Sequence, residues 1–402
     1  MAISGKTRHQ DISVQQNAGG DSQIMLTALH LVTIVTLLVA FGLVMLYSAS
    51  FSRAGVKFFS NQLIWIFLGI AGGFSCFAVG YRRMADLSLI WMALSFVALI
   101  ACLFFKPING AHRWLQFGGF SIQPSEFAKI AVALFTAKYC SDYQWTFSKF
   151  KAHNGLLKLG ITAMLVICAV LAGRDFGTTI LIGAMFCVTL FAAGLYLRYV
   201  IFPMLAVGMM ALYIYLFDAE RLARATSFLH PELVHQGEGY QLWNSLLALG
   251  SGNWFGIGFM ESRMKARYLP EAHTDFIVSI IGEELGFIAL LIIILLYASF
   301  CWCAVKIAKR AYSRLGTLLA FALCCGVTFQ AIINLSVISG SVPTKGMPAP
   351  FISYGGSNMI ACLVAVGLLV SIASEAYDPE GDKRIREAIM GKIFFFIRKK
   401  KR

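Results

Sequence analysis

Ten apolar stretches, separated by polar segments, run through this chain of 402 residues. Most are close to the ~20 residues that an α-helix needs to cross the hydrocarbon core of a bilayer. Water cannot solvate so much apolar surface, since 58% of the residues are hydrophobic and only 13% are charged. We therefore predict an all-α polytopic membrane protein. Its ten predicted transmembrane helices cover residues 24–47, 62–79, 85–105, 126–137, 159–172, 177–195, 199–217, 276–303, 316–338 and 358–374.

The distribution of Lys and Arg predicts how these helices are oriented. With the N-terminus inside, 22 of the 34 Lys and Arg residues fall on the inner side and 6 fall in short outer loops. Cytoplasmic loops carry the excess of positive charge in membrane proteins. We therefore predict that both termini are cytoplasmic and that one large extracytoplasmic loop, residues 218–275, connects the seventh and eighth spans.

The formal net charge of +14 is thus mainly a signal of topology, and nucleic-acid binding is not predicted. We expect three parts: a polar cytoplasmic tail (1–23), a transmembrane domain (24–376) and a basic cytoplasmic tail (377–402). Residues 385–402 combine aromatic and basic side chains, so we expect them to lie on anionic lipid. Within the long loop, the apolar spacing of residues 239–249 predicts an interfacial or re-entrant helix, and the glycines that follow predict a tight turn.

The acidic end of the long loop holds the strongest candidate for chemistry. Nine of the twenty carboxylates lie between Asp218 and Glu284, and Asp275 immediately precedes the eighth span. Partial desolvation there raises the pKa of a carboxylate, which suits it to accept a proton near neutral pH. The alternative is that Thr274 or Asp275 caps the helix. Glu283, like Glu284, lies about two turns further and is either functional or part of a structural ion pair.

Basic residues of the outer loops are candidates for binding a diphosphate. Arg113 has the fork geometry for bidentate contact, although it can also only mark the membrane boundary. Arg263, Lys265 and Arg267 alternate, which places them on one side of an extended segment. That side would hold a diphosphate near Asp275, or it would simply be solvated.

Three polar segments have both a functional and a structural interpretation. In the segment Gln123–Lys129, Glu126 and Lys129 are three residues apart and either pair locally or line a polar groove. Arg174 and Asp175 share a very short turn, where they either neutralise each other or Arg174 adds a cation to the mouth of the cavity. The proline- and glycine-rich segment 342–357 predicts a rigid re-entrant loop whose N–H groups face an anion, with a plain turn as the alternative.

These segments together resemble the SEDS family, whose members include FtsW, RodA and SpoVE. The resemblance covers residues 24–376, and its detail in the long loop is closer to the division-type FtsW members than to RodA. One departure is Arg174, where the family usually has proline, which leaves the local geometry open. The segments that carry the resemblance are Tyr47–Ser50, Asn109–Trp114, Gln123–Lys129, Tyr268–Phe276, Gly282–Glu284 and Pro350–Ser357.

The resemblance implies a peptidoglycan glycosyltransferase of the cytoplasmic (inner) membrane that polymerises lipid II, an undecaprenyl-diphosphate disaccharide-pentapeptide. It implies work at the division septum with a class B penicillin-binding protein and other division-complex membrane proteins. It also implies that Asp275 is the required carboxylate, acting as general base for inverting attack by a sugar 4-hydroxyl. The diphosphate leaves as a stable anion, so no general acid is needed. Substrate-binding candidates are Arg113, Gln123, Glu126, Lys129, Lys265, Arg267, His273, Ser353 and Gly355.

Two alternative functions stay open on the sequence. A lipid II flippase needs a polar path through both leaflets, which the charged residues inside the spans leave open. A RodA-type elongation polymerase would share the same chemistry. Assistance by a divalent cation also stays open, although the carboxylates do not show the spacing of metal ligands.

Overall fold

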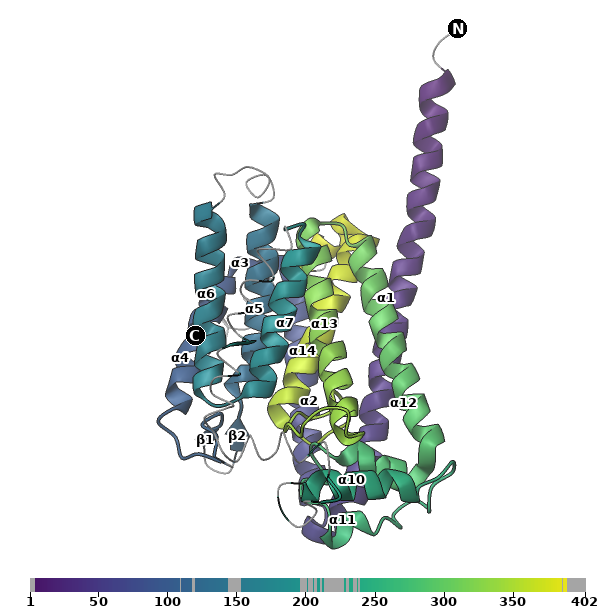
Figure 1. Cartoon of the computed structure of the whole chain (residues 1–402). Coiled ribbons are helices and arrows are strands. Elements are labelled where there is room, and N and C mark those ends of the chain that lie inside the picture. The colour runs from purple at the N-terminus through teal and green to yellow at the C-terminus, as the bar shows by residue number, and fades with distance from the viewer. Residues whose placement is uncertain are drawn as a thin grey trace, which may run out of the picture.

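The structure, a computed structural model, describes residues 4–108, 110–117, 120–143, 153–195, 239–384 and 386–388, with isolated positions between 201 and 237. Nine of the ten predicted spans lie in these residues and are helical, while the seventh, 199–217, lies mostly outside them. Figure 1 shows the helices packed as one bundle. They are α1 (Ser4–Ala54), α2 (Lys57–Val79), α4 (Ser88–Cys102), α5 (Pro124–Asp142), α6 (His153–Ala172), α7 (Phe176–Ala192), α12 (Ile277–Arg310), α13 (Arg314–Ile338) and α14 (Gly356–Tyr377).

Five helices in the described part of the chain are long and apolar enough to cross a bilayer, and three more are shorter and apolar. This confirms a multi-pass, almost entirely helical membrane protein. Helix α1 begins at Ser4, inside the predicted polar tail, and Figure 1 shows its N-terminal part extending beyond the bundle. The basic C-terminal stretch predicted to lie on lipid is, apart from residues 386–388, outside the described residues.

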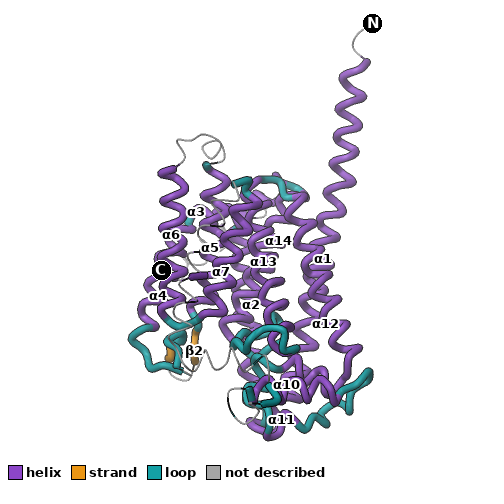
Figure 2. The backbone as a smooth tube through the Cα atoms, in the orientation of Figure 1, coloured by secondary structure: helices purple, strands orange, loops and turns teal. Residues whose placement is uncertain are grey.

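Among the described residues, three short helices lie between the longer ones: α3 (Tyr81–Asp86), α10 (Tyr240–Ser251) and α11 (Met264–Arg267). Helix α10 confirms the helix predicted in the long loop. In Figure 2, α10, α11 and the loops around them gather at one end of the bundle. We call this the outer end, following the charge bias, and the opposite end the cytoplasmic end.

Helices α2 and α14 are far apart in the sequence, yet they pack backbone against backbone. A Cβ atom on Gly367 of α14 would lie 2.2 Å from the carbonyl oxygen of Gly73 in α2, so only glycine fits there. Small residues allow such close approach, which drives helix association inside a membrane. At the outer end of the same pair, Gln62 of α2 donates to the Ser353 carbonyl at 3.3 Å. This pair therefore supports the loop that precedes α14.

A small antiparallel hairpin adds a β element to the helical fold. Strand β1 (Leu115–Phe117) pairs with β2 (Phe120–Ile122), with Leu115 opposite Ile122. Arg113 precedes the first strand by two residues and Gln123 follows the second directly. The hairpin therefore brings these two candidate residues close together at the start of α5.

Helix α12 is broken at Gly286, whose φ of 76° lies in the left-handed region that favours glycine. The break frees backbone groups that the loop after α10 then satisfies. Phe287 N donates to Asn253 O at 2.9 Å, and Ile257 N donates to Glu283 O at 3.0 Å. Non-helical backbone is tolerated near a membrane where protein supplies such partners. The tight turn predicted after α10 is thus attached to the broken helix.

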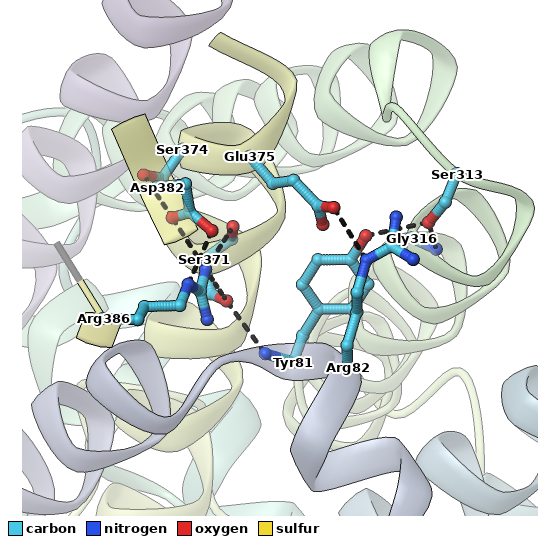
Figure 3. Close-up of polar contacts among 9 residues, drawn as sticks. All are labelled: Tyr81, Arg82, Ser313, Gly316, Ser371, Ser374, Glu375, Asp382 and Arg386. Carbon is cyan, nitrogen blue, oxygen red and sulfur yellow. Dashed lines mark hydrogen bonds and ion pairs between the residues drawn. The ribbon is translucent and has the colours of Figure 1, made fainter. Parts of the chain in front are cut away.

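Two ion pairs between described residues help to hold the cytoplasmic end together (Figure 3). Arg82 Nε lies 2.7 Å from Glu375 Oε1. Arg386 pairs with Asp382 at 2.5 Å and donates to the Ser371 carbonyl at 3.3 Å. These contacts fasten the start of the C-terminal tail to the inner ends of α3 and α14.

Candidate active site

Asp275 lies in the turn just before α12, at the outer end of the bundle. The helix N-cap is Phe276, and no side chain caps this terminus. The Thr274 hydroxyl instead donates to Glu271 Oε2 at 2.7 Å. The capping alternative for Thr274 and Asp275 is therefore wrong, and Asp275 is left available for another role.

The Asp275 carboxylate is half-buried and receives no hydrogen bond from the residues that the structure describes. Burial raises the pKa of this carboxyl group from its ordinary value of 3.8 to about 7. The nearby Glu271 carboxylate raises the pKa further, whereas the positive charge of Arg113 lowers it. A carboxylate in these surroundings can accept a proton at neutral pH.

Gly346 and Lys345, in the loop before α14, complete the surroundings of Asp275. A Cβ atom on Gly346 would lie 2.9 Å from Asp275 Oδ2, so the loop backbone lies directly against the carboxylate. Lys345 is half-buried, and burial lowers the pKa of its ammonium group. No described carboxylate pairs with it. The sequence prediction missed Lys345, although a lysine in a short outer loop runs against the positive-inside bias and was a signal.

His273 and Glu271 shape the same turn. The His273 ring stacks on Phe58 at a centroid distance of 4.4 Å, and its carbonyl accepts from Tyr354 N at 3.0 Å. Glu271 has a φ of 42°, an uncommon conformation for a residue with a side chain. His273 thus ties the turn of Asp275 to α2 and to the loop before α14, while Glu271 acts on the charge of Asp275.

A second cluster surrounds Asp175, at the N-cap of α7. Its Oδ2 atom accepts from Gln123 Nε2 and from Ser125 Oγ, both at 2.8 Å. Arg113 Nη1 lies 3.8 Å from Asp175 Oδ1, and Arg113 Nε is buried without a hydrogen-bond partner in the described chain. Arg113 therefore keeps donor capacity. It is also close enough to Asp275 to influence its pKa, so it links the two clusters.

Of the two interpretations of Arg174 and Asp175, mutual neutralisation is wrong. Arg174 is exposed, and its Nη1 atom is directed to the Gly110 carbonyl at 3.5 Å, while Asp175 pairs with Arg113. Arg174 has a φ of 61°, which the proline ring cannot adopt. The backbone at this position therefore differs from what a proline would allow.

Glu126 and Lys129 form the predicted local pair inside the bundle. Lys129 Nζ lies 2.7 Å from Glu126 Oε2 and donates to Gln330 Oε1, also at 2.7 Å. Both charged side chains are almost fully buried. The ammonium group is thus already satisfied, so the structure favours the local-pair interpretation over a free cation.

Lys265 does not face Asp275. The expectation of an extended basic segment is wrong, because Met264–Arg267 forms the short helix α11. In this helix the Lys265 side chain is directed into the protein. There its ammonium group pairs with Glu284 Oε1 at 2.5 Å and donates to Ser48 Oγ at 2.9 Å. The Arg267 side chain lies outside the described part of the structure.

Glu283 and Glu284 hold the long loop onto α12. Glu284 accepts from Ser48 at 2.7 Å, and Glu283 accepts from the Ser262 hydroxyl and from Arg263 N at 3.0 Å. Both glutamates are buried. Of the two interpretations left by the sequence, these contacts favour the structural one.

Ser353 and Gly355 form part of the loop before α14. The Ser353 hydroxyl accepts from Ala349 N at 2.8 Å, and Gly355 N is directed to Gln62 Oε1 at 3.4 Å. These contacts shape the loop itself. Among the described residues, no group of three or more His, Cys, Asp or Glu side chains gathers in a way that would hold a metal ion.

Comparison with known proteins decides the family. A sequence-family model described as "Cell cycle protein" and named for FtsW, RodA and SpoVE matches residues 28–378. The chain belongs to this family. The match confirms the SEDS resemblance, and it covers both Asp175 and Asp275.

Curated members of the FtsW/RodA/SpoVE family align over most of their length. A Trichlorobacter lovleyi protein named "Probable peptidoglycan glycosyltransferase FtsW" is 35% identical over 355 residues, 86% of this chain and 93% of that relative. The "Stage V sporulation protein E" of Bacillus subtilis is 36% identical over 358 residues, 86% of this chain and 96% of that relative.

Two solved structures share the fold of this chain. The Thermus thermophilus rod shape determining protein RodA superposes with a TM-score of 0.65 at 24% identity, covering 87% of this chain and 97% of RodA. A second structure, described as "Structural coordination of polymerization and crosslinking by a peptidoglycan synthase complex", gives a TM-score of 0.71 at 25% identity. It covers 87% of this chain and 98% of the matched chain.

Proposed function

We propose that this chain is a peptidoglycan glycosyltransferase that polymerises lipid II at the outer face of the membrane, with Asp275 as its general base. The observation that carries the proposal is the half-buried Asp275 carboxylate, which is unpaired within the described chain and whose surroundings raise its pKa to about 7. Its place in a family whose curated relatives are named as peptidoglycan glycosyltransferases supplies the reaction.

The chemistry needs one base and a site for a diphosphate. The acceptor sugar hydroxyl attacks the anomeric carbon of the donor and forms a new C–O bond. The bond from that carbon to the diphosphate oxygen breaks, and its electron pair leaves with the lipid diphosphate. The hydroxyl proton passes to Asp275. Direct displacement from the opposite side inverts the anomeric centre.

Arg113 and Lys345 are the cations best placed to stabilise the diphosphate. Arg113 is about a quarter exposed, and its ion pair with Asp175 is long, at 3.8 Å. Lys345 is adjacent in sequence to Gly346, which touches the base, and has no described carboxylate partner. Lys129 and Lys265, by contrast, are held by Glu126 and Glu284. Cations aimed at developing negative charge lower the barrier without proton transfer.

The decisive experiment gives lipid II to the purified protein, alone and with a partner transpeptidase, and compares Asp275→Asn with the wild type. Losing a general base typically costs about 10²- to 10⁴-fold in rate. Glu261→Asn, a substitution of an exposed carboxylate in the same long loop, is the matched control and should polymerise normally. Wild-type polymerisation by Asp275→Asn would exclude Asp275 as the base.

The same preparation separates polymerisation from transport. A flippase would move labelled lipid II across proteoliposomes without forming glycan strands in any condition. The buried ammonium groups of Lys129 and Lys265 are held by Glu126 and Glu284 in the described chain, so neither lysine offers a free cation along a path between the leaflets. This favours the polymerase over the flippase.

The relatives support a cellular setting for this proposed function. The similarity to proteins named FtsW favours action in septal wall synthesis at the cytoplasmic membrane, rather than a RodA-type role in elongation. The neighbour described as a synthase complex that coordinates polymerisation with crosslinking supports a class B penicillin-binding protein as partner. Depletion of the protein in its host should then block septation and leave filaments, whereas an elongation polymerase would give rounded cells.

A further inference from the structure

Asn334 of α13 lies at the junction between the two loops that form the candidate active site. Its side chain is 1% exposed. The amide nitrogen Nδ2 donates to the backbone carbonyl of Asp275 and to that of Met347, both at 2.8 Å. One buried amide therefore bridges the turn that carries the proposed base and the loop that lies against it.

This bridge determines what the Asp275 carboxylate touches. Met347 directly follows Gly346, whose missing Cβ leaves the space that Asp275 Oδ2 occupies. Fixing the Met347 carbonyl fixes the position of Gly346. Fixing the Asp275 carbonyl fixes the start of its side chain. Asn334 thus sets both sides of the contact.

Holding the base through its backbone avoids a conflict. A donor bonded to the carboxylate itself would orient it but would also stabilise the ionised form and lower its pKa. A donor bonded to the carbonyl of the same residue orients the side chain at its root and leaves the carboxylate free to take a proton. No described donor binds the Asp275 carboxylate, which agrees with this arrangement.

We propose that Asn334 is a positioning residue for the general base, acting through the Asp275 backbone and through the placement of Gly346. The inference rests on the proposed function of Asp275. Gln330, one turn earlier on α13, supports the same loop at the next residue, since its Nε2 atom donates to the Pro348 carbonyl at 2.9 Å. Only Asn334 of these two amides also holds Asp275.

The test measures polymerisation of lipid II by purified Asn334→Leu, which keeps the branched shape and the number of heavy atoms of the side chain but removes both N–H donors. We expect kcat to fall about tenfold or more, with little change in KM, because misplacing a catalytic group by about 1 Å can cost as much as 10²-fold. We also expect the acid limb of the pH–rate profile to move to lower pH, since a released carboxylate becomes more solvated and its pKa falls.

The control is Asn244→Ala in α10, which removes another buried amide donating to a backbone carbonyl, that of Tyr240 at 2.9 Å. It should lower the thermal midpoint without moving the acid limb. Asn334→Ser, with its small side chain, repeats the measurement if the leucine variant does not fold. An unchanged acid limb together with wild-type kcat per folded molecule, in either Asn334 variant, would overturn the proposal. If Asp275→Asn is inactive at the same time, the base assignment survives and only the role of Asn334 falls.

Discussion

Asp275 and Glu284 lie nine residues apart at the outer end of the bundle, yet their surroundings are opposite. Glu284 is fully buried and accepts from Lys265 at 2.5 Å and from Ser48 at 2.7 Å. Asp275 is half-buried, has a second carboxylate nearby and receives no hydrogen bond from the described residues. A carboxylate with a complete set of donors stabilises the fold, whereas one without donors keeps a raised pKa and can accept a proton.

The largest effect on stability should come from breaking the buried ion pair between Lys265 and Glu284. Glu284→Gln leaves the Lys265 ammonium buried without its counter-charge, and breaking a buried ion pair typically costs about 3–5 kcal/mol of the free energy of unfolding. We expect the thermal unfolding midpoint of the variant to lie far below that of the wild type when both are measured in the same detergent. Lys265→Met should cost a similar amount.

The double variant Lys265→Met with Glu284→Gln tells an ion pair from two independent contacts. Because neither charge is then left alone, its loss should be smaller than the sum of the two single losses. Glu261→Gln, on the exposed surface of the same loop, is the control and should change the free energy of unfolding by less than about 0.5 kcal/mol. Strict additivity of the two single variants would show that Lys265 and Glu284 do not act as a pair.

The sequence predicts the transmembrane helices well because lipid solvates an apolar helix directly, so the pattern alone decides it. It could not decide between base and helix cap for Asp275, since the choice depends on α12 beginning at Ile277 with Phe276 as N-cap. A difference of one residue in the helix start separates the two roles. Helix boundaries are the least certain part of such predictions.

The sequence also could not predict which residues far apart in the chain form contacts with each other. Lys265 binds Ser48, which lies 217 positions earlier in the chain, so no local pattern identifies it as structural. The contact of Gly346 with Asp275 likewise depends on how two loops meet in space. By contrast, the pair of Glu126 and Lys129 was accessible, because residues three apart in a helix are neighbours.

A substitution with a smaller expected effect tests the surroundings of Asp275. Gly346→Ala places a methyl group 2.9 Å from Asp275 Oδ2, which is closer than ordinary van der Waals contact. The carboxylate sits at the end of a side chain and can rotate away, so we expect little loss of stability. Turnover of lipid II should nevertheless fall about tenfold, because small misplacements of a catalytic group are costly.

Gly250→Ala, in α10, is the matched control, because nothing lies within 4 Å of the added Cβ. Its turnover should be that of the wild type. Full turnover by Gly346→Ala would mean that the contact between this loop and the carboxylate has no part in catalysis.

The pH dependence of the rate tests the raised pKa directly. A base must be ionised to act, so with a pKa of about 7 the ionised fraction of Asp275 falls about tenfold between pH 8 and pH 6. We expect the initial rate of polymerisation at constant ionic strength to fall by a similar factor. A rate that is flat over this range would place the pKa of the base near its ordinary value and contradict the desolvated site.

The smallest effect concerns stability, where Asp275→Asn should act in the direction opposite to Glu284→Gln. A carboxyl group whose pKa is raised from 3.8 to about 7 by folding binds more protons in the folded state than in the unfolded state between these values. The free energy of unfolding of the wild type therefore falls as pH rises through this window, and Asn, which does not ionise, removes that loss. We expect Asp275→Asn to be more stable than the wild type by on the order of 1 kcal/mol at pH 8, with the difference shrinking toward pH 5. Thermal midpoints of both proteins across this range measure it. A variant less stable than the wild type at pH 8 would show that the carboxylate has a stabilising partner and that Asp275 resembles Glu284 after all.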